Sequence, residues 1–169
     1  RKDEVTLRSH KIFKHTLGSD PATDIEVFHE EDETYNVGVG KFKSKKWLYI
    51  HSGSTVADEY RLLNAETPEG DWNVKQPRVR DLEYGLAHYK DHFYILTNLE
   101  ARNFRLMRTH ETMTSLENWE EIIPHRSDFL LEDMNVFTDY LVLSEKEQAQ
   151  GRIRIIHWDS NADHYIEFD

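Results

Sequence analysis

His92-Phe93-Tyr94-Ile95-Leu96 is a short apolar run with aromatic residues, and it has two further copies in the 169-residue chain. Aligned on Leu48, Phe93 and Tyr140, the copies Trp47-Leu48-Tyr49-Ile50 and Tyr140-Leu141-Val142-Leu143 lie 45 residues before it and 47 residues after it. Each run is followed about a dozen residues later by a second one, whose arginine recurs as Arg61, Arg105 and Arg154. A tryptophan segment recurs as Trp72 and Trp119. The chain therefore repeats a unit of about 45 to 49 residues.

Each run is short, rich in aromatic and β-branched residues, and bounded by turn residues, which predicts strands rather than helices. Another candidate strand precedes the first run of each unit, at residues 35–41, 84–89 and 130–137, and a tight turn joins the two as a hairpin. The Trp72 and Trp119 segments supply a fourth strand. Four antiparallel strands in one such unit are typical of a propeller blade. The sequence predicts an all-β fold, a partial β-propeller of about three to four blades of four-stranded antiparallel sheet.

We expect a single propeller fragment over residues 1–169, with blades at approximately 35–80, 81–127 and 128–169. Residues 1–34 are predicted to hold the outer strands of an incomplete blade, at Val5–Phe13 and Asp24–His29. The acidic run Glu30–Glu33 is interpreted as a hairpin turn. Thr114-Ser115-Leu116-Glu117 matches a helix-capping pattern, but Pro124 limits any helix there to a short turn.

Composition excludes several classes of function. The chain has no Cys, so disulfide frameworks, thiol catalysis and cysteine-ligated metals are excluded. The formal net charge of -11 disfavours nucleic acid and anionic membranes as partners and favours cationic partners through long-range steering. No run approaches the ~18 apolar residues that cross a bilayer, and no signal-type stretch follows the first residues. We expect a cytoplasmic location, with the periplasm as the alternative.

The motifs searched for predict no catalytic residue, no metal site and no cofactor. Ser52 and Ser54 lack the flanking glycines of a nucleophile elbow and are interpreted as turn serines. His88 and His92 have helical ligand spacing but flank a hairpin turn, and His110-Glu111 lacks the second histidine of a zinc helix. The remaining histidines have no ligand-like spacing; they are His10, His15, His29, His51, His125, His157 and His164.

Two loop motifs imitate binding sites. Asp159–Asp163 begins like a calcium loop, but His164 stands where the loop needs glycine, so it is interpreted as a polar loop. Gly38-Val39-Gly40 is half of a dinucleotide fingerprint without a following helix, and its small residues are better explained by close packing of an inner strand. Carboxylates are plentiful, yet no spacing singles out a glycosidase pair.

The recurrent Arg61, Arg105 and Arg154 have two possible roles. They could form a basic ring that contacts a peptide carboxylate, or each could pair with an acid on the next strand. We favour the structural role, because a position that recurs in every blade usually serves the blade. The residues that bind substrate are unknown at this stage.

Several segments together resemble the oligopeptidase B (protease II) branch of the prolyl oligopeptidase family of serine peptidases, specifically its N-terminal propeller. The segments that carry the resemblance are His15-Thr16-Leu17-Gly18-Ser19-Asp20-Pro21, Ile50-His51-Ser52-Gly53-Ser54-Thr55 with Glu59-Tyr60-Arg61, Phe93-Tyr94-Ile95-Leu96-Thr97-Asn98 with Asn103-Phe104-Arg105-Leu106, Trp119-Glu120-Glu121-Ile122-Ile123-Pro124-His125-Arg126, and Leu130-Leu131-Glu132-Asp133. They cover nearly the whole chain in order.

The resemblance implies the propeller of a cytoplasmic serine peptidase that cleaves short peptides after Lys or Arg. It also implies a C-terminal α/β-hydrolase domain of the same polypeptide as partner, basic oligopeptides as substrates, and a gating role that limits substrate size. This chain carries no nucleophile elbow, so we expect it to be inactive alone. An independent propeller-type module that binds peptides or proteins is the alternative. Because few repeats cannot close a ring, we also expect self-association.

Overall fold

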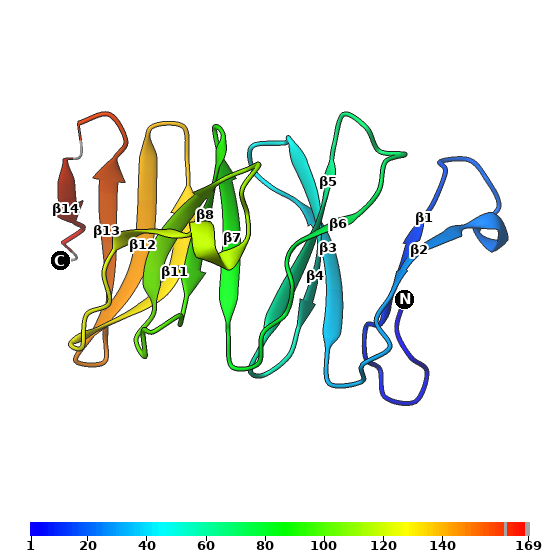
Figure 1. Ribbon diagram of the computed structural model, residues 1–169, viewed down its shortest axis with the longest axis horizontal. Coiled ribbons are helices and arrows are strands. Elements are labelled where there is room, and N and C mark those ends of the chain that lie inside the picture. Colours follow the sequence, from blue (N-terminus) through cyan, green and yellow to red (C-terminus); the bar gives the residue numbers. More distant parts are fainter. Residues whose placement is uncertain (161, 168–169) are drawn as a thin grey trace. The chain divides into compact units, whose positions relative to one another are not determined.

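The computed structural model describes residues 1–160 and 162–167. Its regular structure in these residues consists of strands and two single turns of 3-10 helix. Strands that are consecutive in sequence are neighbours in every sheet, so each sheet is an antiparallel meander (Figure 1). The chain divides into two compact units: Arg1–Lys41 with Lys46–Arg80, and Phe42–Lys45 with the chain from Asp81 onward. Among the described residues, no helix is long and apolar enough to span a membrane.

Unit 1 contains a two-stranded sheet and a four-stranded sheet. The two-stranded sheet pairs β1 (Lys11–Lys14) with β2 (Ile25–His29), and the four-stranded sheet runs β3 (Asn36–Lys41), β4 (Trp47–Gly53), β5 (Asp58–Asn64) and β6 (Asn73–Gln76). Ile50 and Ser52 in β4 are completely buried, while Tyr49, His51 and Gly53 are only partly buried. This alternation is the period of two that predicted strands here.

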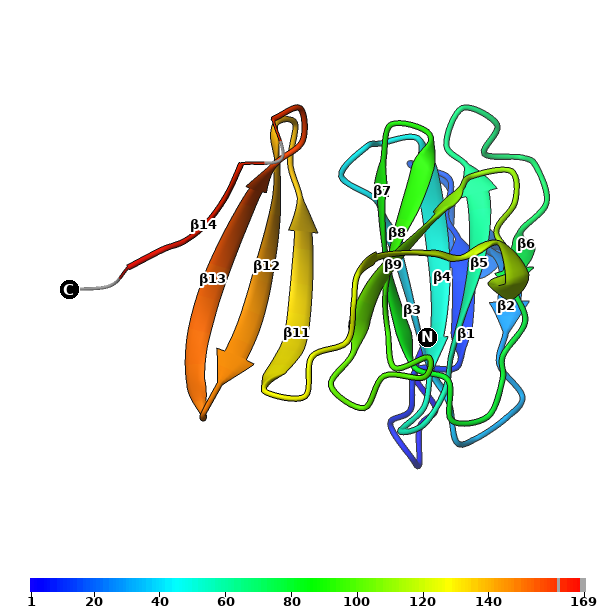
Figure 2. The ribbon, with the colours of Figure 1, turned by 60° about the vertical axis from the view of Figure 1, so that its left-hand side comes forward.

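Unit 2 contains two four-stranded sheets. The first runs β7 (Tyr84–Tyr89), β8 (His92–Thr97), β9 (Arg105–His110) and β10 (Glu120–Ile123), and the second runs β11 (Phe129–Val136), β12 (Tyr140–Glu147), β13 (Gln150–His157) and β14 (Asp163–Tyr165). Figure 2 shows β11, β12 and β13 lying side by side. Strand β11 packs against β7 and β8.

The apolar runs that define the repeat form the core of unit 2. Leu106, Leu141 and Leu143 are at most 2% exposed and belong to one cluster with Tyr94 and Leu96. Burying side chains of this kind stabilises the fold by about 1.5–3 kcal/mol each. The cluster draws on both sheets, which explains why they form one compact unit.

The all-β prediction is confirmed, and several local expectations need correction. Strand β1 begins at Lys11 rather than Val5, because Asp3 forms a side-chain turn with the backbone of Val5 and Thr6. Glu30–Glu33 is not a hairpin turn: it connects β2 to β3, which lie in different sheets.

The short helical elements differ slightly from the prediction. The expected turn near Thr114 is a 3-10 turn at Leu116–Asn118 whose N-cap, Ser115, makes no capping side-chain hydrogen bond. A second 3-10 turn, Pro21–Thr23, was not predicted; the Asp20 carboxylate accepts a hydrogen bond from the Ala22 N–H there. Strand β14 was also missed, because its three residues lack apolar alternation.

Candidate functional site

The serines considered as nucleophiles have structural roles. The Ser54 hydroxyl accepts hydrogen bonds from the N–H groups of Val56 and Ala57 and donates to the Ala57 carbonyl, so Ser54 stabilises the turn before β5. Ser52 is 0% exposed within β4 and cannot reach a substrate. The interpretation of Ser54 as a turn serine is confirmed, whereas Ser52 is a buried strand residue.

Several histidines pair with carboxylates. His51 contacts Asp58 at 2.6 Å, and His92 contacts Asp91 at 2.6 Å. His88 is buried in β7 and its cross-strand partner is Phe93, while His92 pairs with Tyr89, so the side chains of His88 and His92 lie on opposite faces of the sheet. Within residues 1–160 and 162–167, no group of three or more His, Asp or Glu side chains is placed to hold a metal ion. The polar loop Asp159–Asp163 includes Asn161, which lies outside the described residues.

A Ser–His–Glu hydrogen-bond chain in unit 2 was not identified from the sequence. The His88 Nδ1 lies 2.9 Å from the Ser44 hydroxyl, and its Nε2 lies 3.0 Å from the Glu111 carboxylate. The His88 side chain is 0% exposed, so it cannot exchange protons with a bound substrate. The contacts instead satisfy a buried imidazole, as buried polar groups require. Residues 44, 88 and 111 follow no motif spacing that could have signalled this arrangement.

Gly40 has a packing role that the sequence indicated only in general terms. A Cβ added at Gly40 would lie 2.4 Å from the Tyr49 hydroxyl oxygen, because Tyr49 is its cross-strand partner on β4. A Cβ added at Gly38 would meet nothing within 4 Å. The absence of a side chain at Gly40 therefore makes room for the Tyr49 ring.

The recurrent arginines are ion-paired, as the structural interpretation predicts. Arg105 on β9 pairs with Glu121 on β10 at 2.9 Å, and Arg154 on β13 pairs with Asp163 on β14. Arg61 differs, because its partner Glu59 lies on the same strand, at 2.6 Å. Its guanidinium also stacks on the Phe28 ring, 4.2 Å from the centroid. These arginines stabilise the sheets and do not form a ring of unpaired cations.

One charged cluster lies within unit 1 and is called the Arg78 cluster: Glu30, Glu59, Arg61 and Arg78. Arg78 Nη2 contacts Glu30 Oε2 at 2.7 Å and Glu59 Oε1 at 3.0 Å, and its backbone N–H donates to Glu59 Oε2 at 3.0 Å. Both glutamates are only 5% exposed. Burial, the largest single cause, raises the pKa of Glu30 and of Glu59, but the hydrogen bonds and positive charges around each carboxylate, those of Arg78 foremost, together outweigh it and leave each pKa below its ordinary 4.5.

A second charged cluster lies within unit 2 and is called the Glu145 cluster: Arg126, Glu145, Arg154, Asp163 and Tyr165. The fully buried Glu145 accepts from Arg126 at 2.5 Å and from the Tyr165 hydroxyl at 2.7 Å, and lies 3.7 Å from Arg154. The Arg154 Nε–H donates a hydrogen bond to the Asp163 carboxylate at 2.9 Å. That hydrogen bond outweighs partial burial and lowers the pKa of Asp163. In both clusters the charges balance, so neither offers a surplus charge to a ligand.

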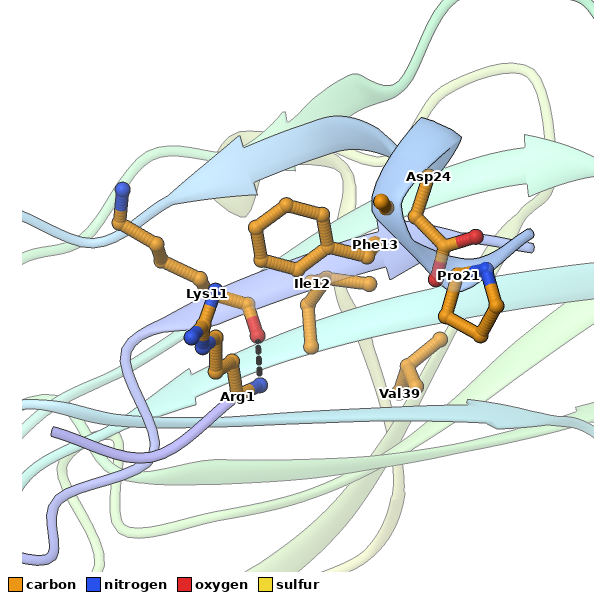
Figure 3. Close-up of a pocket in the computed structure, with 8 residues that line it drawn as sticks. Arg1, Lys11, Ile12, Phe13, Pro21, Asp24 and Val39 are labelled. Atoms are coloured by element: carbon orange, nitrogen blue, oxygen red, sulfur yellow. Dashed lines mark hydrogen bonds between the residues drawn. The ribbon is translucent and has the colours of Figure 1, made fainter. Parts of the chain in front are cut away.

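A groove lies beside β1 in unit 1. It consists of two adjoining cavities of about 730 and 600 Å³ that share Ile12, Phe13 and Val39. Figure 3 shows Ile12 and Phe13 on β1, with the Arg1 amino group donating to the Lys11 carbonyl at 2.5 Å. Val39 is 57% exposed at this groove. Apolar side chains beside a strand edge suit an extended segment more than a charged small molecule.

A second cavity, of about 520 Å³, lies in unit 2 at the ends of β7, β8 and β13. Buried Tyr94, Ile123 and Leu141 form part of its wall, together with the stacked rings of Tyr89 and Trp158, whose centroids are 4.6 Å apart. Its other lining residues are charged or polar at several positions: Lys90, Asp91, His92, Arg108, Arg154, Asp159 and Asp163. Its volume lies in the range of small-ligand sites, ~300–1,000 Å³, and half of its lining residues are charged or polar.

Successive four-stranded meander sheets with blade-sized spacing define a propeller-type domain. The model of the prolyl oligopeptidase N-terminal β-propeller domain matches residues 1–169, and the chain belongs to this family.

Curated relatives agree with this assignment. Dipeptidyl aminopeptidase BI of Pseudoxanthomonas mexicana is 34% identical over 99% of this chain, and protease 2 of Moraxella lacunata is 27% identical over 89% of it. The chain spans 23% and 21% of the lengths of these two relatives. The matched domain is therefore a part of larger peptidases in both.

Solved structures show the same fold. Oligopeptidase B from Trypanosoma brucei, with covalently bound antipain in a closed form, matches with a TM-score of 0.89 and 25% identity, covering 99% of this chain and 25% of that one. Oligopeptidase B from Leishmania major matches with a TM-score of 0.89 at 23% identity, over 99% of this chain and 25% of that one. The prediction of a partial β-propeller is confirmed.

Proposed function

We propose that the chain is the propeller part of an oligopeptidase-B-like serine peptidase that cleaves short peptides after Lys or Arg. The observation that supports this most is the family match over residues 1–169, together with the likeness to an oligopeptidase B structure. The nucleophile would be supplied by a C-terminal α/β-hydrolase domain of the same polypeptide. The propeller would gate that site and exclude large substrates, and the chain alone would be inactive, in the cytoplasm.

The net charge of -11 supports basic oligopeptides as substrates, because an acidic surface raises the encounter rate with cationic peptides. Steering of this kind weakens as salt screens the charges. Neutralising exposed acids of the propeller in the full-length polypeptide should therefore lower kcat/KM for basic peptides, most clearly at low ionic strength. An unchanged kcat/KM at low ionic strength would remove the steering role.

Hydrolysis by the full-length polypeptide tests the proposed specificity. The panel contains a blocked peptide with Arg before the scissile bond, the same peptide with Pro there, and a dipeptidyl substrate with an unblocked N-terminus. The proposal expects preferred cleavage of the blocked Arg peptide, and none by the 169-residue chain alone. Preference for the unblocked dipeptidyl substrate would favour an aminopeptidase activity like that in the name of the first relative.

An independent module that binds peptides or proteins is the second candidate, and the cavity in unit 2 and the groove beside β1 favour it. The two candidates differ in the reading frame after Asp169. A continuation into a domain with a Gly-x-Ser-x-Gly elbow supports the peptidase, because that turn presents the nucleophile. A stop codon there supports the binding module.

We also propose that β1 and β2 are the outer strands of an incomplete blade, and that the groove beside β1 promotes self-association. Ile25 is 59% exposed and Val39 57% exposed, and a two-stranded sheet is marginal alone. Light scattering of the chain should show dimers or larger species, and Val39→Lys should shift the population toward monomer. A monomeric wild-type chain at high concentration would contradict this proposal.

A further inference from the structure

The cavity in unit 2 has a rigid aromatic wall. Tyr89 and Trp158 stack at an interplanar angle of 11°, and Tyr94 lies 5.1 Å from the Trp158 ring. Each outer ring is also anchored by its polar atom: the Tyr89 hydroxyl donates to the Thr138 carbonyl at 2.6 Å, and the Trp158 indole N–H donates to the Phe137 carbonyl at 2.9 Å. A preformed aromatic face suits the aliphatic stem and charged end of a basic side chain.

The charged groups at this cavity include both signs. Arg154 and Asp163 satisfy each other through their hydrogen bonds. Arg108, on β9, has a side chain that is 46% exposed; it lies 3.5 Å from the mostly exposed Glu120 and donates a hydrogen bond to the hydroxyl of buried Tyr94, which leaves other guanidinium N–H groups for a ligand. Asp159 follows β13 and is exposed, and none of the described residues forms an ion pair with it. Lys90 and Asp91 also line the cavity, and Asp91 is paired with His92 at 2.6 Å. The cavity therefore presents the Arg108 guanidinium and the Asp159 carboxylate to a ligand, with Lys90 as a second exposed cation.

We propose that this cavity binds short peptides that end in Lys or Arg, with the terminal carboxylate on Arg108 and the basic side chain along Trp158 toward Asp159. A peptide of this kind carries a cation and an anion on its last residue, which matches the two open charges. Burial raises the pKa of Tyr94, so its neutral hydroxyl remains a hydrogen-bond donor to the same carboxylate. The choice of ligand rests on the proposed function, because cleavage after Lys or Arg releases peptides with this end.

Binding of Ala-Ala-Arg to the protein, followed by calorimetry and by the change in tryptophan fluorescence that Trp158→Phe should remove, tests the inference. The matched probes are Ala-Ala-Arg amide, which lacks the carboxylate, and Ala-Ala-norleucine, which lacks the cation. Each should bind about fivefold more weakly than Ala-Ala-Arg, since a partly exposed ionic contact contributes up to ~1 kcal/mol. Equal binding of the acid and the amide, or no saturable binding of Ala-Ala-Arg, overturns the inference.

Two variants test which protein residue contacts each charged group of the peptide. Arg108→Gln should remove the preference for the acid over the amide, and Asp159→Asn should remove the preference for Arg over norleucine. Arg102→Gln and Asp128→Asn are matched controls, because both residues are exposed and neither lines the cavity. Controls that weaken binding as much as the cavity variants also overturn the inference.

The peptide-binding experiment and the hydrolysis experiment test the inference and the proposed function separately. If the full-length polypeptide cleaves after Lys or Arg but Ala-Ala-Arg does not bind here, the site is wrong and the proposed function stands. If Ala-Ala-Arg binds with the expected preferences but no such cleavage occurs, the site stands as a peptide site and the proposed function is wrong.

Discussion

The Arg78 cluster of unit 1 and the Glu145 cluster of unit 2 both neutralise buried charges, but the central group has the opposite sign in each. In unit 1 a single cation, Arg78, contacts two carboxylates that are each 5% exposed. In unit 2 a single anion, Glu145, is 1% exposed and contacts two arginines and a tyrosine hydroxyl. The central group is a cation in one cluster and an anion in the other.

The difference determines what remains after the central group is removed. Without Arg78, Glu59 keeps Arg61 at 2.6 Å, but Glu30 loses its cation while it is only 5% exposed and lies too deep for full hydration. Without Glu145, both arginines still reach water, because the Arg126 side chain is 31% exposed and the Arg154 side chain is 19% exposed. Arg154 also keeps Asp163 as its ion-pair partner. A buried charge left unpaired costs more free energy than a cation that reaches water. Unit 1 should therefore be more sensitive to loss of its central group.

Arg78→Met has the largest expected effect. It should lower the free energy of unfolding by about 3 kcal/mol, because breaking a buried ion pair leaves an uncompensated charge. Urea unfolding followed by circular dichroism measures the change, and Lys41→Met, at an exposed position of the same unit, is the control. An Arg78→Met effect no larger than that of Lys41→Met would mean that the glutamates are hydrated in solution.

Glu145→Gln has the next largest expected effect, a loss of about 2 kcal/mol, because hydrogen bonds to a charged group contribute ~1.5–3 kcal/mol. Glutamine preserves the shape and one acceptor oxygen, so the charge is what is removed. Glu132→Gln on β11 is the control, since Glu132 is 39% exposed and lies 3.4 Å from Lys146. If Glu145→Gln destabilises more than Arg78→Met in the same urea experiment, the proposed ranking of the two clusters is reversed.

Acid should affect the two clusters in different pH ranges. The pKa of Glu30 and the pKa of Glu59 lie below 4.5 in the folded protein, so their stabilisation is complete above pH 4.5 and is lost as the pH falls through the folded values. The pKa of Asp163 is lowered from 3.8, so the loss of its contribution begins only below pH 3.8, whereas that of the glutamates begins below pH 4.5.

An acid titration followed by residue-resolved NMR measures this difference. Amide signals of β5 should weaken at higher pH than those of β13, and in Arg78→Met the stability of β5 should vary less between pH 5 and pH 3. Simultaneous loss of β5 and β13 signals in the wild-type protein would show that the clusters are not protonated independently.

The sequence predicted most strands because their runs alternate and repeat. It did not predict β14, whose residues Asp163–Tyr165 are polar, nor the β12–β13 turn, where Gln148 and Ala149 both adopt positive φ without the usual Asn-Gly pair. The charge clusters were also missed. Glu30 and Arg78 are 48 residues apart, and only the packing of separate strands and loops brings them together. The cavity charges were missed for the same reason, because Arg108 lies on β9 and Asp159 lies in the turn after β13, which belongs to a different sheet.

The smallest expected effect belongs to Arg105, the recurrent arginine outside both clusters. Its partner Glu121 is 39% exposed, so water screens the 2.9 Å pair and it should contribute only about 0.5 kcal/mol. A double-mutant cycle with Arg105→Gln and Glu121→Gln isolates that coupling, and it should shrink further in 1 M salt. A coupling that does not change with salt and is as large as the effect of Glu145→Gln would contradict this prediction. It would show that the burial of the carboxylate does not determine how much each arginine ion pair stabilises the fold.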